Sequence, residues 1–598
     1  MKWLLKLRRK SFINPGRWWS KRFGGRSLAI PLAMLVGIVA ALLAGLLHNM
    51  VHYLELLSQR MSRTSPLLFG CFLLLPLAGM FFSFIIQRFA GGVRYAKSLS
   101  PLILSLHRRQ SRIPFTEMFT HMLSSAVSVG LGGSAGLEAP SVLTGAAVGA
   151  NTSSLFGVPR RMQILLIGCG GSAAIAAIFQ SPIGGVLFAI EVLMPEFSVA
   201  ALVPMLISSA VAMVISRTCF PHEQVLLAIN TPWRTDAIPF YFLCGLCCAL
   251  VGVYMLKVAH SLAAILKKAF PSRYKKLFIC GVMLCVILAL FPILRGQGTA
   301  FIAQLFDGNT ADIAAQPMWL RLLPSWGVVV IMVAAAIFVK VIASIITVDG
   351  GGDGGIFAPT MFVGAFTGFA FARLINLTGI IELQEPNFVV VGICGVFSAV
   401  LRAPLTGIFL IADVTDSYIL LVPLMIVSSV SWAAARHFEP HSIYRKPLAD
   451  SGLLSDDRDL SMLQRFSVRM CVKNDYAPLR STCTLTQLQA KLPQLHSKEI
   501  FPVLDEKKKL SGIIYTKELL PLLLSPELNP SLLVFDLMAK PRCTISIDDN
   551  LASAMEYLER FKLDYLPVNK KDGSFSGFVS RSDIFKLYRS LIRDAERY

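Results

Sequence analysis

The stretch from Gly136 to Gly149 reads GLEAPSVLTGAAVG, and the stretch from Gly355 to Gly368 reads GIFAPTMFVGAFTG. The two share a frame of Gly, Ala-Pro, Gly-Ala and Gly, with no gap between them. A second pair follows in the same order: SPIGGVLFAIE from Ser181 to Glu191 and APLTGIFLIAD from Ala403 to Asp413. The members of each pair lie about 220 residues apart, a spacing typical of an internally duplicated transporter fold rather than of a short repeat array. The pattern leaves open whether the two halves are parallel or inverted.

The composition around these repeats indicates a membrane body with a soluble tail. Of the 598 residues, 54% are hydrophobic and 16% are charged, which excludes a soluble globular protein and a disordered one. Residues 1–448 hold 35 basic and 16 acidic side chains, whereas the remaining residues hold 22 and 20. We therefore expect a multi-span body that ends near residue 448, and its positive charge favours lipid head groups or small anions as partners.

The N-terminal segment has the charge pattern of a cytoplasmic flank. Nine Lys or Arg and no acidic residue precede Ser27, and the run from Leu28 to Met50 carries no formal charge. This run is long enough to cross a bilayer, and the basic flank places residues 1–27 in the cytoplasm. We expect the segment to be retained, because no cleavage site typical of a secretory signal follows it.

Each repeat places Ala-Pro after a glycine-rich turn and before an apolar helical stretch. Proline in a first turn marks the start of a helix, whose free N–H groups and partial positive charge can hold an anion. Two such helix starts that meet inside the membrane would bind an anion through backbone donors. The alternative is that Gly and Ala in this frame only allow close helix packing.

Glu138 lies in the glycine-rich turn of the first repeat, where the second repeat has Phe357. It is the only acidic residue between Glu117 and Glu191. An isolated carboxylate within a membrane is costly and is a candidate for a functional site. We expect Glu138 to act as a tethered gate that occupies the place of an anion when ionised. The alternative is a carboxylate that only caps the helix.

These residues resemble the CLC family of chloride channels and chloride/proton antiporters. The family's G-(R/K)-E-G-P motif is similar to GLEAP at Gly136 to Pro140, and its G-x-F-x-P motif is similar to GIFAP at Gly355 to Pro359. The segment SIYRKPL from Ser442 to Leu448 resembles the one that carries the family's anion-binding tyrosine. The resemblance implies an all-α, multi-pass, CLC-type body at residues 28–448, with repeat halves at about 28–217 and 237–448.

The same resemblance implies roles for single residues. Glu138 becomes the gating glutamate, Tyr444 a hydroxyl donor to the anion, and Ile356 and Phe357 backbone N–H donors. Ser98, in KSLSP, matches the family's central serine, although both glycines of that motif are missing. The resemblance further implies a homodimer with one pathway in each subunit, chloride as the transported ion, and no required cofactor.

The residue at position 192 bears on whether the protein is a passive channel or an antiporter. Antiporters of the family carry a proton-transfer glutamate directly after the acid that aligns with Glu191, and this chain has Val192 there. Valine cannot bind a proton, so the sequence favours a passive anion channel gated by voltage or pH, with Glu138 as its gate. The alternative is a chloride/proton antiporter that uses a different internal proton route. Glu191 itself is interpreted as a structural acid at a helix end.

Two basic residues in apolar surroundings have open interpretations. Lys340 either pairs with an acid such as Asp413 or Asp416, which we favour, or raises the anion potential in a vestibule. Arg402 either lies at a water-filled mouth or extends to the interface.

An intramembrane serine hydrolase is the alternative of another class. Gly132 to Gly136 reads GGSAG, a formal match to a nucleophile elbow, and His121 lies upstream. The second repeat reads GGDGG at the equivalent place, so Asp353 replaces Ser134 while the glycines persist. The repeated feature is therefore backbone shape. We expect His121 to be an inert packed histidine and the protein not to be an enzyme.

The tail contains a duplication of its own. FPVLDEKKKLSGIIYTKEL from Phe501 and LPVNKKDGSFSGFVSRSDI from Leu566 match at a spacing of 65 residues, and each predicts two strands and a helix. This resembles a CBS-domain pair, a small cytoplasmic α/β unit. The expected boundaries are a linker at 449–465 and CBS domains at 466–530 and 531–598.

The resemblance implies an adenine-nucleotide site in the tail with Ser580 and Asp583, and the alternative is a purely structural pair that forms dimers. We expect a cell-membrane protein with both termini in the cytoplasm and with no metal and no nucleic acid bound.

Overall fold

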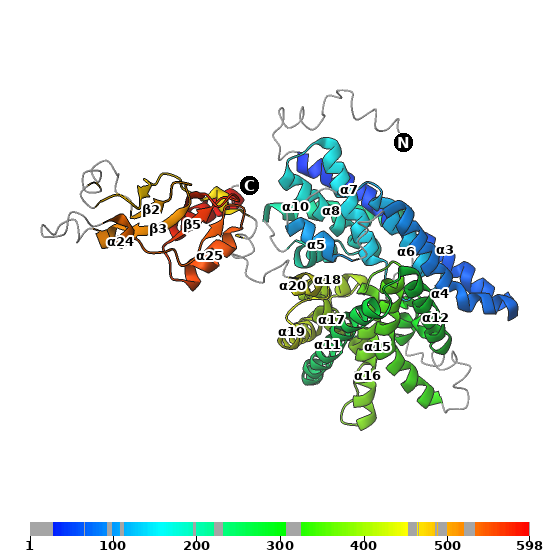
Figure 1. Cartoon of the computed structure of the whole chain (residues 1–598). Coiled ribbons are helices and arrows are strands. Elements are labelled where there is room, and N and C mark those ends of the chain that lie inside the picture. The colour runs from blue at the N-terminus through cyan, green and yellow to red at the C-terminus, as the bar shows by residue number, and fades with distance from the viewer. Residues whose placement is uncertain are drawn as a thin grey trace. The chain divides into compact units, whose positions relative to one another are not determined.

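The computed structural model describes residues 28–64, 66–91, 98–107, 113–194, 199–220, 231–306, 325–451, 463, 466–484, 487, 499–519 and 533–596. The predicted cytoplasmic flank at residues 1–27 lies outside the described residues, as does most of the predicted linker. The chain divides into two compact units between Ser451 and Gly452. Figure 1 shows a helical unit and a smaller unit that contains strands.

The first unit is helical throughout its described residues. Its α-helices are α3 Ala29–Thr64, α4 Pro66–Ile86, α5 Ser100–His107, α6 Glu117–Gly130, α7 Glu138–Phe156, α8 Arg160–Phe179, α9 Pro182–Phe188, α10 Val199–Cys219, α11 Ile238–Ala269, α12 Arg273–Leu290, α13 Thr299–Phe306, α15 Ser325–Gly350, α16 Phe357–Thr378, α17 Glu385–Leu401, α18 Pro404–Val414, α19 Leu421–Phe438 and α20 Lys446–Asp450. Short π-helices η2 Gln87–Gly91 and η4 Ala189–Leu193 and 3-10 helices η5 Thr235–Ala237 and η6 Pro292–Leu294 join them.

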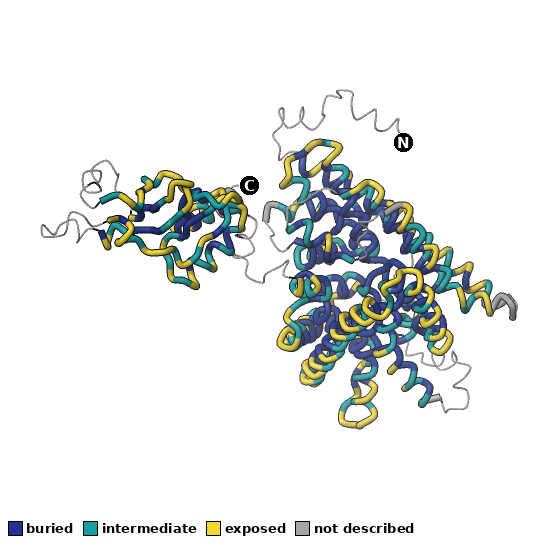
Figure 2. The backbone as a smooth tube through the Cα atoms, viewed as in Figure 1, coloured by how far each residue is buried: buried dark blue, intermediate teal, exposed yellow. Residues whose placement is uncertain are grey.

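Eight helices among the described residues are long and apolar enough to cross a membrane, which confirms the multi-span body. Three shorter apolar helices among the described residues, α9 with η4, α17 and α18, also belong to the two repeats. The buried residues gather in the interior of this unit, as Figure 2 shows in dark blue, while α7, α8, α16 and α17 are buried over most of their length. The helices of the repeats therefore form the core of this unit.

The two repeats meet at their glycine-rich turns. Gly136 and Gly355 form an antiparallel bridge, in which the Gly136 N–H donates to the Gly355 oxygen at 2.8 Å and the Gly355 N–H donates back at 2.7 Å. Because equivalent residues pair antiparallel, the two halves are related by a two-fold rotation about an axis across the strand direction. The duplication is inverted, which the sequence had left open.

A second reciprocal contact joins α9 to α18. Glu191, at the end of the first repeat, accepts hydrogen bonds from the N–H groups of Leu405 and Thr406 at the start of α18, at 3.1 and 2.8 Å. Asp413, its equivalent in the second repeat, accepts from the Ser181 hydroxyl at the start of α9, at 2.6 Å. Each acid thus stabilises the positive N-terminal end of the partner helix.

The later glycines of the repeat frame serve close helix packing. A Cβ atom on Gly149 would lie 2.0 Å from the Leu166 oxygen of α8, and one on Gly368 would lie 1.9 Å from the Phe388 oxygen of α17. These contacts bring α7 against α8 and α16 against α17 in the same way. The packing alternative therefore holds for these glycines, whereas the first glycine and Ala-Pro of each frame lie at the meeting point of the repeats.

The second unit contains two three-stranded sheets of the same topology. Its strands are β1 Leu479–Arg480, β2 Ile500–Leu504, β3 Leu510–Tyr515, β4 Ile545–Ser546, β5 Tyr565–Asn569 and β6 Phe575–Ser580, and its helices include α24 Val534–Leu537, α25 Leu551–Arg560 and α26 Arg581–Glu596. In each sheet the middle strand pairs parallel with the first strand and antiparallel with the third. Val503 pairs with Gly512 as Val568 pairs with Gly577, at the predicted spacing of 65 residues.

The two halves of this unit exchange segments, which the predicted boundaries at residues 466 and 531 do not capture. Lys473 forms a bridge with Phe578 of the second sheet, and Ala539 forms one with Ile513 of the first sheet. Val468 lies in the core of the second half, and Val534 lies in the core of the first. Each half is therefore completed by a segment that precedes the other half in the chain.

Candidate functional site

Glu138 is the first residue of α7 and lies at the meeting point of the repeats. Its side chain is buried, with 2% of the residue exposed, and its carboxylate Oε2 accepts a hydrogen bond from the Ala358 N–H in the first turn of α16, at 3.4 Å. Its own backbone N–H also faces the carboxylate. The acidic group of the first repeat therefore lies between the N-terminal ends of α7 and α16. This is the place where two helix dipoles favour negative charge.

Gly136 leaves the space that this carboxylate fills. A Cβ atom built on Gly136 would lie 2.1 Å from Oε2 of Glu138 and 3.0 Å from the Ala358 N atom. A side chain here would therefore displace the carboxylate from the amide group of α16. Gly136 therefore has two roles: it forms the bridge with Gly355, and it leaves room for the Glu138 carboxylate.

The two expected backbone donors begin the second repeat. Ile356 precedes α16, and Phe357 is its first residue, so neither N–H has an acceptor within the helix. The Phe357 ring packs against rings of three surrounding helices, at centroid distances of 4.8–5.9 Å: Phe179, Phe188 and Phe397. At the place equivalent to Glu138, the second repeat thus has an apolar anchor that fixes the direction of its amide groups.

Tyr444 lies in the segment that leads into α20. Only 4% of the residue is exposed, and its hydroxyl group has no hydrogen-bond partner among the described residues. The charge of Glu138 acts on this hydroxyl electrostatically, so the two groups lie in one neighbourhood. A buried hydroxyl without a partner is costly, and a bound anion would satisfy it.

Ser98 lies just before α5. Its hydroxyl donates to the Ser100 hydroxyl at 2.9 Å and accepts from the Ser100 N–H at 3.1 Å, so it caps the start of that helix. The helix packs against α20, which follows Tyr444, and against η4, which contains Val192. The structure therefore brings the elements of the predicted serine and tyrosine together. Val192 itself is buried among apolar residues of η4.

Lys340 does not pair with Asp413 or Asp416, so these two acids were wrong, and the acid that acts on it electrostatically is Glu55 of α3. Its buried ammonium group donates to the carbonyl oxygens of Leu294 and Gly296, at 3.0 and 2.8 Å. It also lies 4.9 Å from the centre of the Phe362 ring. Asp413 is occupied at the start of α9. Lys340 thus joins α15 to the segment before α13.

Arg402 follows α17 in a left-handed conformation, with φ of 61°. Gln180 occupies the equivalent place after α8 and has φ of 52°. The Arg402 guanidinium is half-buried and donates to the backbone oxygen of Glu439. Both residues thus end their helix in the same left-handed conformation.

The hydrolase motif does not assemble a nucleophile with its base. Ser134 is buried, and its N–H donates to the Thr347 hydroxyl at 3.2 Å. Among the described residues, no histidine forms a hydrogen bond with its side chain. His121 instead lies with Nδ1 3.5 Å from Oδ2 of Asp353. His121 is thus buried and also contacts a carboxylate, which the sequence did not predict.

Sequence reasoning missed this pair of buried titratable side chains. The signal was available, because Asp353 is an acid in an apolar glycine-rich stretch and His121 is a titratable residue in an apolar helix. Their separation of more than 200 residues hid the contact. The inverted duplication alone brings α6 against the loop that precedes α16.

In the second unit, Ser580 and Asp583 lie at the end of β6 and the start of α26. The Ser580 hydroxyl donates to Oδ2 of Asp583 at 2.7 Å, and Oδ1 lies 2.6 Å from the Lys473 ammonium group. Burial raises the pKa of the Asp583 carboxyl, but Lys473 and Ser580 more than offset this and hold the pKa below its usual value. The predicted ribose-binding acid thus already has two partners.

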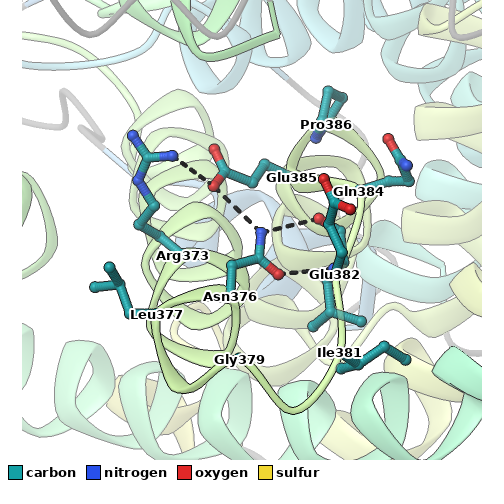
Figure 3. A pocket seen from close by; sticks show the side chains of 10 residues that line it. Arg373, Asn376, Leu377, Gly379, Ile381, Glu382, Gln384, Glu385 and Pro386 are labelled. Carbon is teal, nitrogen blue, oxygen red and sulfur yellow. Dashed lines mark hydrogen bonds and ion pairs between the residues drawn. The ribbon is translucent and has the colours of Figure 1, made fainter.

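A cavity of about 650 Å³ lies at the loop between α16 and α17, away from Glu138. Figure 3 shows that Asn376 and Arg373 both reach Glu385, and the guanidinium nitrogen of Arg373 is 3.0 Å from that carboxylate. Asn376 also bonds the backbone of Leu383 through both polar atoms. These bonds hold the loop itself, and none of the predicted site residues lines the cavity.

Comparison with known proteins places both units in families. A family model described as voltage gated chloride channel matches residues 78–436, and one described as CBS domain matches residues 534–590. The H(+)/Cl(-) exchange transporter ClcA of Vibrio vulnificus (strain YJ016) is 26% identical over 417 residues, which cover 66% of this chain and 84% of that protein. The voltage-gated ClC-type chloride channel ClcB of Escherichia coli O81 (strain ED1a) is 27% identical over 338 residues, which cover 55% and 74%.

Solved structures share the fold. A slow cyanobacterial Cl-/H+ antiporter has a TM-score of 0.60 at 21% identity and covers 72% of this chain and 99% of its own. A eukaryotic CLC transporter has a TM-score of 0.62 at 17% identity and covers 93% and 97%. The predicted fold class, a duplicated membrane body followed by a small α/β unit, is confirmed.

Proposed function

We propose, because this chain belongs to the voltage gated chloride channel family, that it moves chloride across a membrane in exchange for protons. The observation that carries the proposal is the position of the Glu138 carboxylate on the N-terminal amide of α16. An anion and this carboxylate would compete for the same helix N-terminus, the carboxylate through the Ala358 N–H and the anion through the N–H groups of Ile356 and Phe357, since both are negative. Protonation of Glu138 removes the charge that would repel the anion from this place.

The donors suit chloride because none of them carries a full charge. The N–H groups of Ile356 and Phe357 and the hydroxyl of Tyr444 offer neutral hydrogen bonds in a buried place. Neutral donors avoid the large desolvation cost of a buried ammonium or guanidinium group. Ser98 joins them in this proposal through the packing of α5 on α20. Fluoride or nitrate would meet the same donors.

Exchange is favoured over the passive channel that Val192 led us to expect. The relatives that match most of their own length include proteins named as H(+)/Cl(-) exchange transporters. Glu138 supplies a group that can carry a proton to the anion site. Since Val192 cannot bind a proton, the internal step of the exchange must use another route.

The proposal extends to assembly and location. Large apolar side chains are exposed on α9, α10, α18 and α19, the helices of the reciprocal contact and their neighbours: Ile183, Val203, Leu206, Leu405, Val422 and Met425. We propose that a second copy covers part of this surface and lipid the rest, with one pathway in each subunit. Both termini would lie in the cytoplasm of a cell-membrane protein.

For an adenine nucleotide to bind in the tail, its ribose would have to replace Lys473 as the partner of the Asp583 carboxylate. A purely structural pair remains the competing proposal, and the existing bond between the two side chains supports it. The two proposals are tested by adding ATP to the intact protein and measuring the thermal unfolding of the tail. A ligand that binds only the folded tail raises the stability of the folded tail, so a higher unfolding temperature with ATP supports nucleotide binding.

The test of exchange is a reversal potential. The protein is reconstituted in liposomes with opposed chloride and pH gradients, and the potential of zero current is measured. We expect a value displaced from the chloride equilibrium potential toward that set by the proton gradient. A value at the chloride equilibrium potential would mean a channel, and the absence of chloride flux would reject transport altogether.

A further inference from the structure

His121 and Asp353 are a pair of buried titratable groups that the proposed gate does not use. His121 lies on α6, and Asp353 lies in the loop that leads into α16, and both side chains are fully buried. Nδ1 of His121 is 3.5 Å from Oδ2 of Asp353. The pair belongs to opposite halves of the duplication and lies where the two halves meet.

Hydrogen bonds hold Asp353 as an acceptor. The Ser124 hydroxyl donates to Oδ2, and the Gly354 N–H donates to Oδ1 at 3.0 Å. The backbone N–H of Asp353 in turn donates to the Ser128 hydroxyl, at 3.2 Å. Donors on both oxygens favour the ionised carboxylate, but an isolated buried charge is costly. A protonated His121 supplies the opposite charge at this place.

Other charged groups on the elements around His121 are accounted for. Glu117 on α6 itself interacts with His121 electrostatically, α4 has no Asp, Glu, His, Lys or Arg, and Arg88 of η2 donates to the Tyr274 hydroxyl. The remaining titratable and charged groups on the packed elements are His48, His52, Glu55, Arg60 and Arg63 of α3, Glu138 of α7, and Lys340 and Asp349 of α15. Asp353 is the carboxylate in direct contact with His121.

The backbone joins this pair to the anion donors. Asp353 is followed by Gly354, which has φ of 159°, and by Gly355, which is bonded to Gly136 in both directions. Ile356 and Phe357, whose N–H groups are the proposed anion donors, come next. Two residues, Gly354 and Gly355, thus separate Asp353 from Ile356, and the second of them is held by both hydrogen bonds of the bridge to Gly136.

We propose that His121 and Asp353 together bind one proton and that this proton raises the anion affinity of the α16 N-terminus. With the proton bound, imidazolium and carboxylate cancel each other, and the loop carries no net charge. Without it, the carboxylate remains as a net negative charge close to the donors and repels an anion. A unit charge at about 10 Å in a protein interior changes binding by roughly tenfold. The inference rests on the proposed function, since it concerns the same anion site.

The experiment measures chloride binding to the purified full chain in detergent by isothermal titration calorimetry, at pH values from about 5 to 8, the range in which histidine titrates. All proteins carry Glu138→Gln, so that the gate does not contribute a titrating carboxylate. We expect chloride affinity to fall by about tenfold across this range. Chloride affinity that is independent of pH in this background would overturn the inference and leave the proposed function standing. No chloride binding at any pH would overturn the proposed anion site, and the inference with it.

Two further substitutions should move the pH profile in opposite directions. Asp353→Asn removes the negative charge and should hold the affinity at the acid value throughout, whereas His121→Asn removes the imidazolium that would neutralise the carboxylate and should hold it at the alkaline value. If either protein fails to elute as a single species from a sizing column, the double variant His121→Asn/Asp353→Asn, which has no charge at the pair, replaces it and should match Asp353→Asn. A tenfold pH dependence that survives in Asp353→Asn or in the double variant would reject the pair as the proton site.

Discussion

At the scale of single residues, the two repeats differ at a position that matters for the proposed function. Glu138 and Phe357 occupy equivalent places, yet the first contributes a carboxylate to the shared site and the second a ring buried among Phe179, Phe188 and Phe397. The second repeat therefore supplies rigid amide groups, and the first supplies the titratable group that competes for them. A second carboxylate at position 357 would repel the carboxylate of Glu138.

Glu138→Gln should separate the two transported ions. Glutamine keeps the shape of the side chain but carries no charge and no transferable proton, so we expect chloride flux to persist and the coupled proton flux to fall below detection. The two fluxes are followed in the same liposomes, with a chloride electrode and a pH-sensitive dye. Glu382→Gln, at an exposed position between α16 and α17, is the control and should keep both fluxes. Coupled proton movement in Glu138→Gln would remove the gate assignment.

Tyr444→Phe removes one hydroxyl that has no partner among the described residues. If that hydroxyl donates to chloride, the loss of one hydrogen bond should raise KM for chloride by roughly threefold to tenfold while kcat stays nearly constant. The measurement is the initial rate of chloride efflux at a series of concentrations. Tyr254→Phe, which loses a bond to the Phe338 oxygen instead, should leave KM unchanged. An unchanged KM in Tyr444→Phe would mean that the hydroxyl does not contact the ion.

At the scale of helices, the sequence predicted where the site helices begin but not their mutual direction. Ala-Pro after a glycine-rich turn predicted the starts of α7 and α16, because proline in a first turn has no donor to lose. The inverted arrangement was out of reach, since matched motifs give an equivalence and carry no direction. The reciprocal caps of Glu191 and Asp413 follow from that direction and could not be predicted either.

The same limit explains the error at Lys340. A buried ammonium group needs partners, and the sequence offered two acids on a neighbouring apolar stretch. The structure satisfies it with the carbonyl oxygens of Leu294 and Gly296, which any residue type can provide. Every residue has a backbone carbonyl oxygen, so a sequence does not show which of them a buried charge will bond. The prediction therefore assigned Lys340 to acidic side chains instead.

Gly149→Ala tests the packing of α7 on α8. The new methyl group would lie 2.0 Å from the Leu166 oxygen, so the helices must separate, at a cost of about 1–3 kcal/mol. We expect a lower midpoint of thermal unfolding, read from the loss of monodisperse protein after heating in detergent. Gly70→Ala is the matched control on α4, where no atom lies within 4 Å of the added group, and it should be neutral or slightly stabilising.

At the scale of the whole molecule, composition located the change from membrane body to tail within a few residues, because the density of charge differs between them. The boundary between the two halves of the tail was harder to predict from the sequence. Its two halves exchange the segments around Lys473 and Ala539, and such contacts do not alter composition. One consequence is that Lys473, outside the second motif, reaches Asp583 within it.

This contact makes the stability of the tail depend on pH. The pKa of Asp583 is lower in the folded tail than its ordinary value of 3.8, so its ionised form stabilises the folded state above that value. The stabilisation is lost as the pH falls through the lower pKa of the folded state. Asp583→Asn should therefore weaken the tail at neutral pH, and wild type and variant should converge as the pH falls below the folded-state pKa of Asp583.

Hydrogen exchange of the intact protein, measured by mass spectrometry, compares wild type and Asp583→Asn at each pH, so that the intrinsic dependence of exchange on pH cancels. We expect faster exchange in β6 and α26 of the variant at pH 7, where Lys473 has lost its partner. Glu556→Gln changes an exposed carboxylate on α25 and should exchange as wild type does at every pH. A difference between Asp583→Asn and wild type that stays constant down to acid pH would show that geometry, and not the charge of Asp583, stabilises this part of the tail.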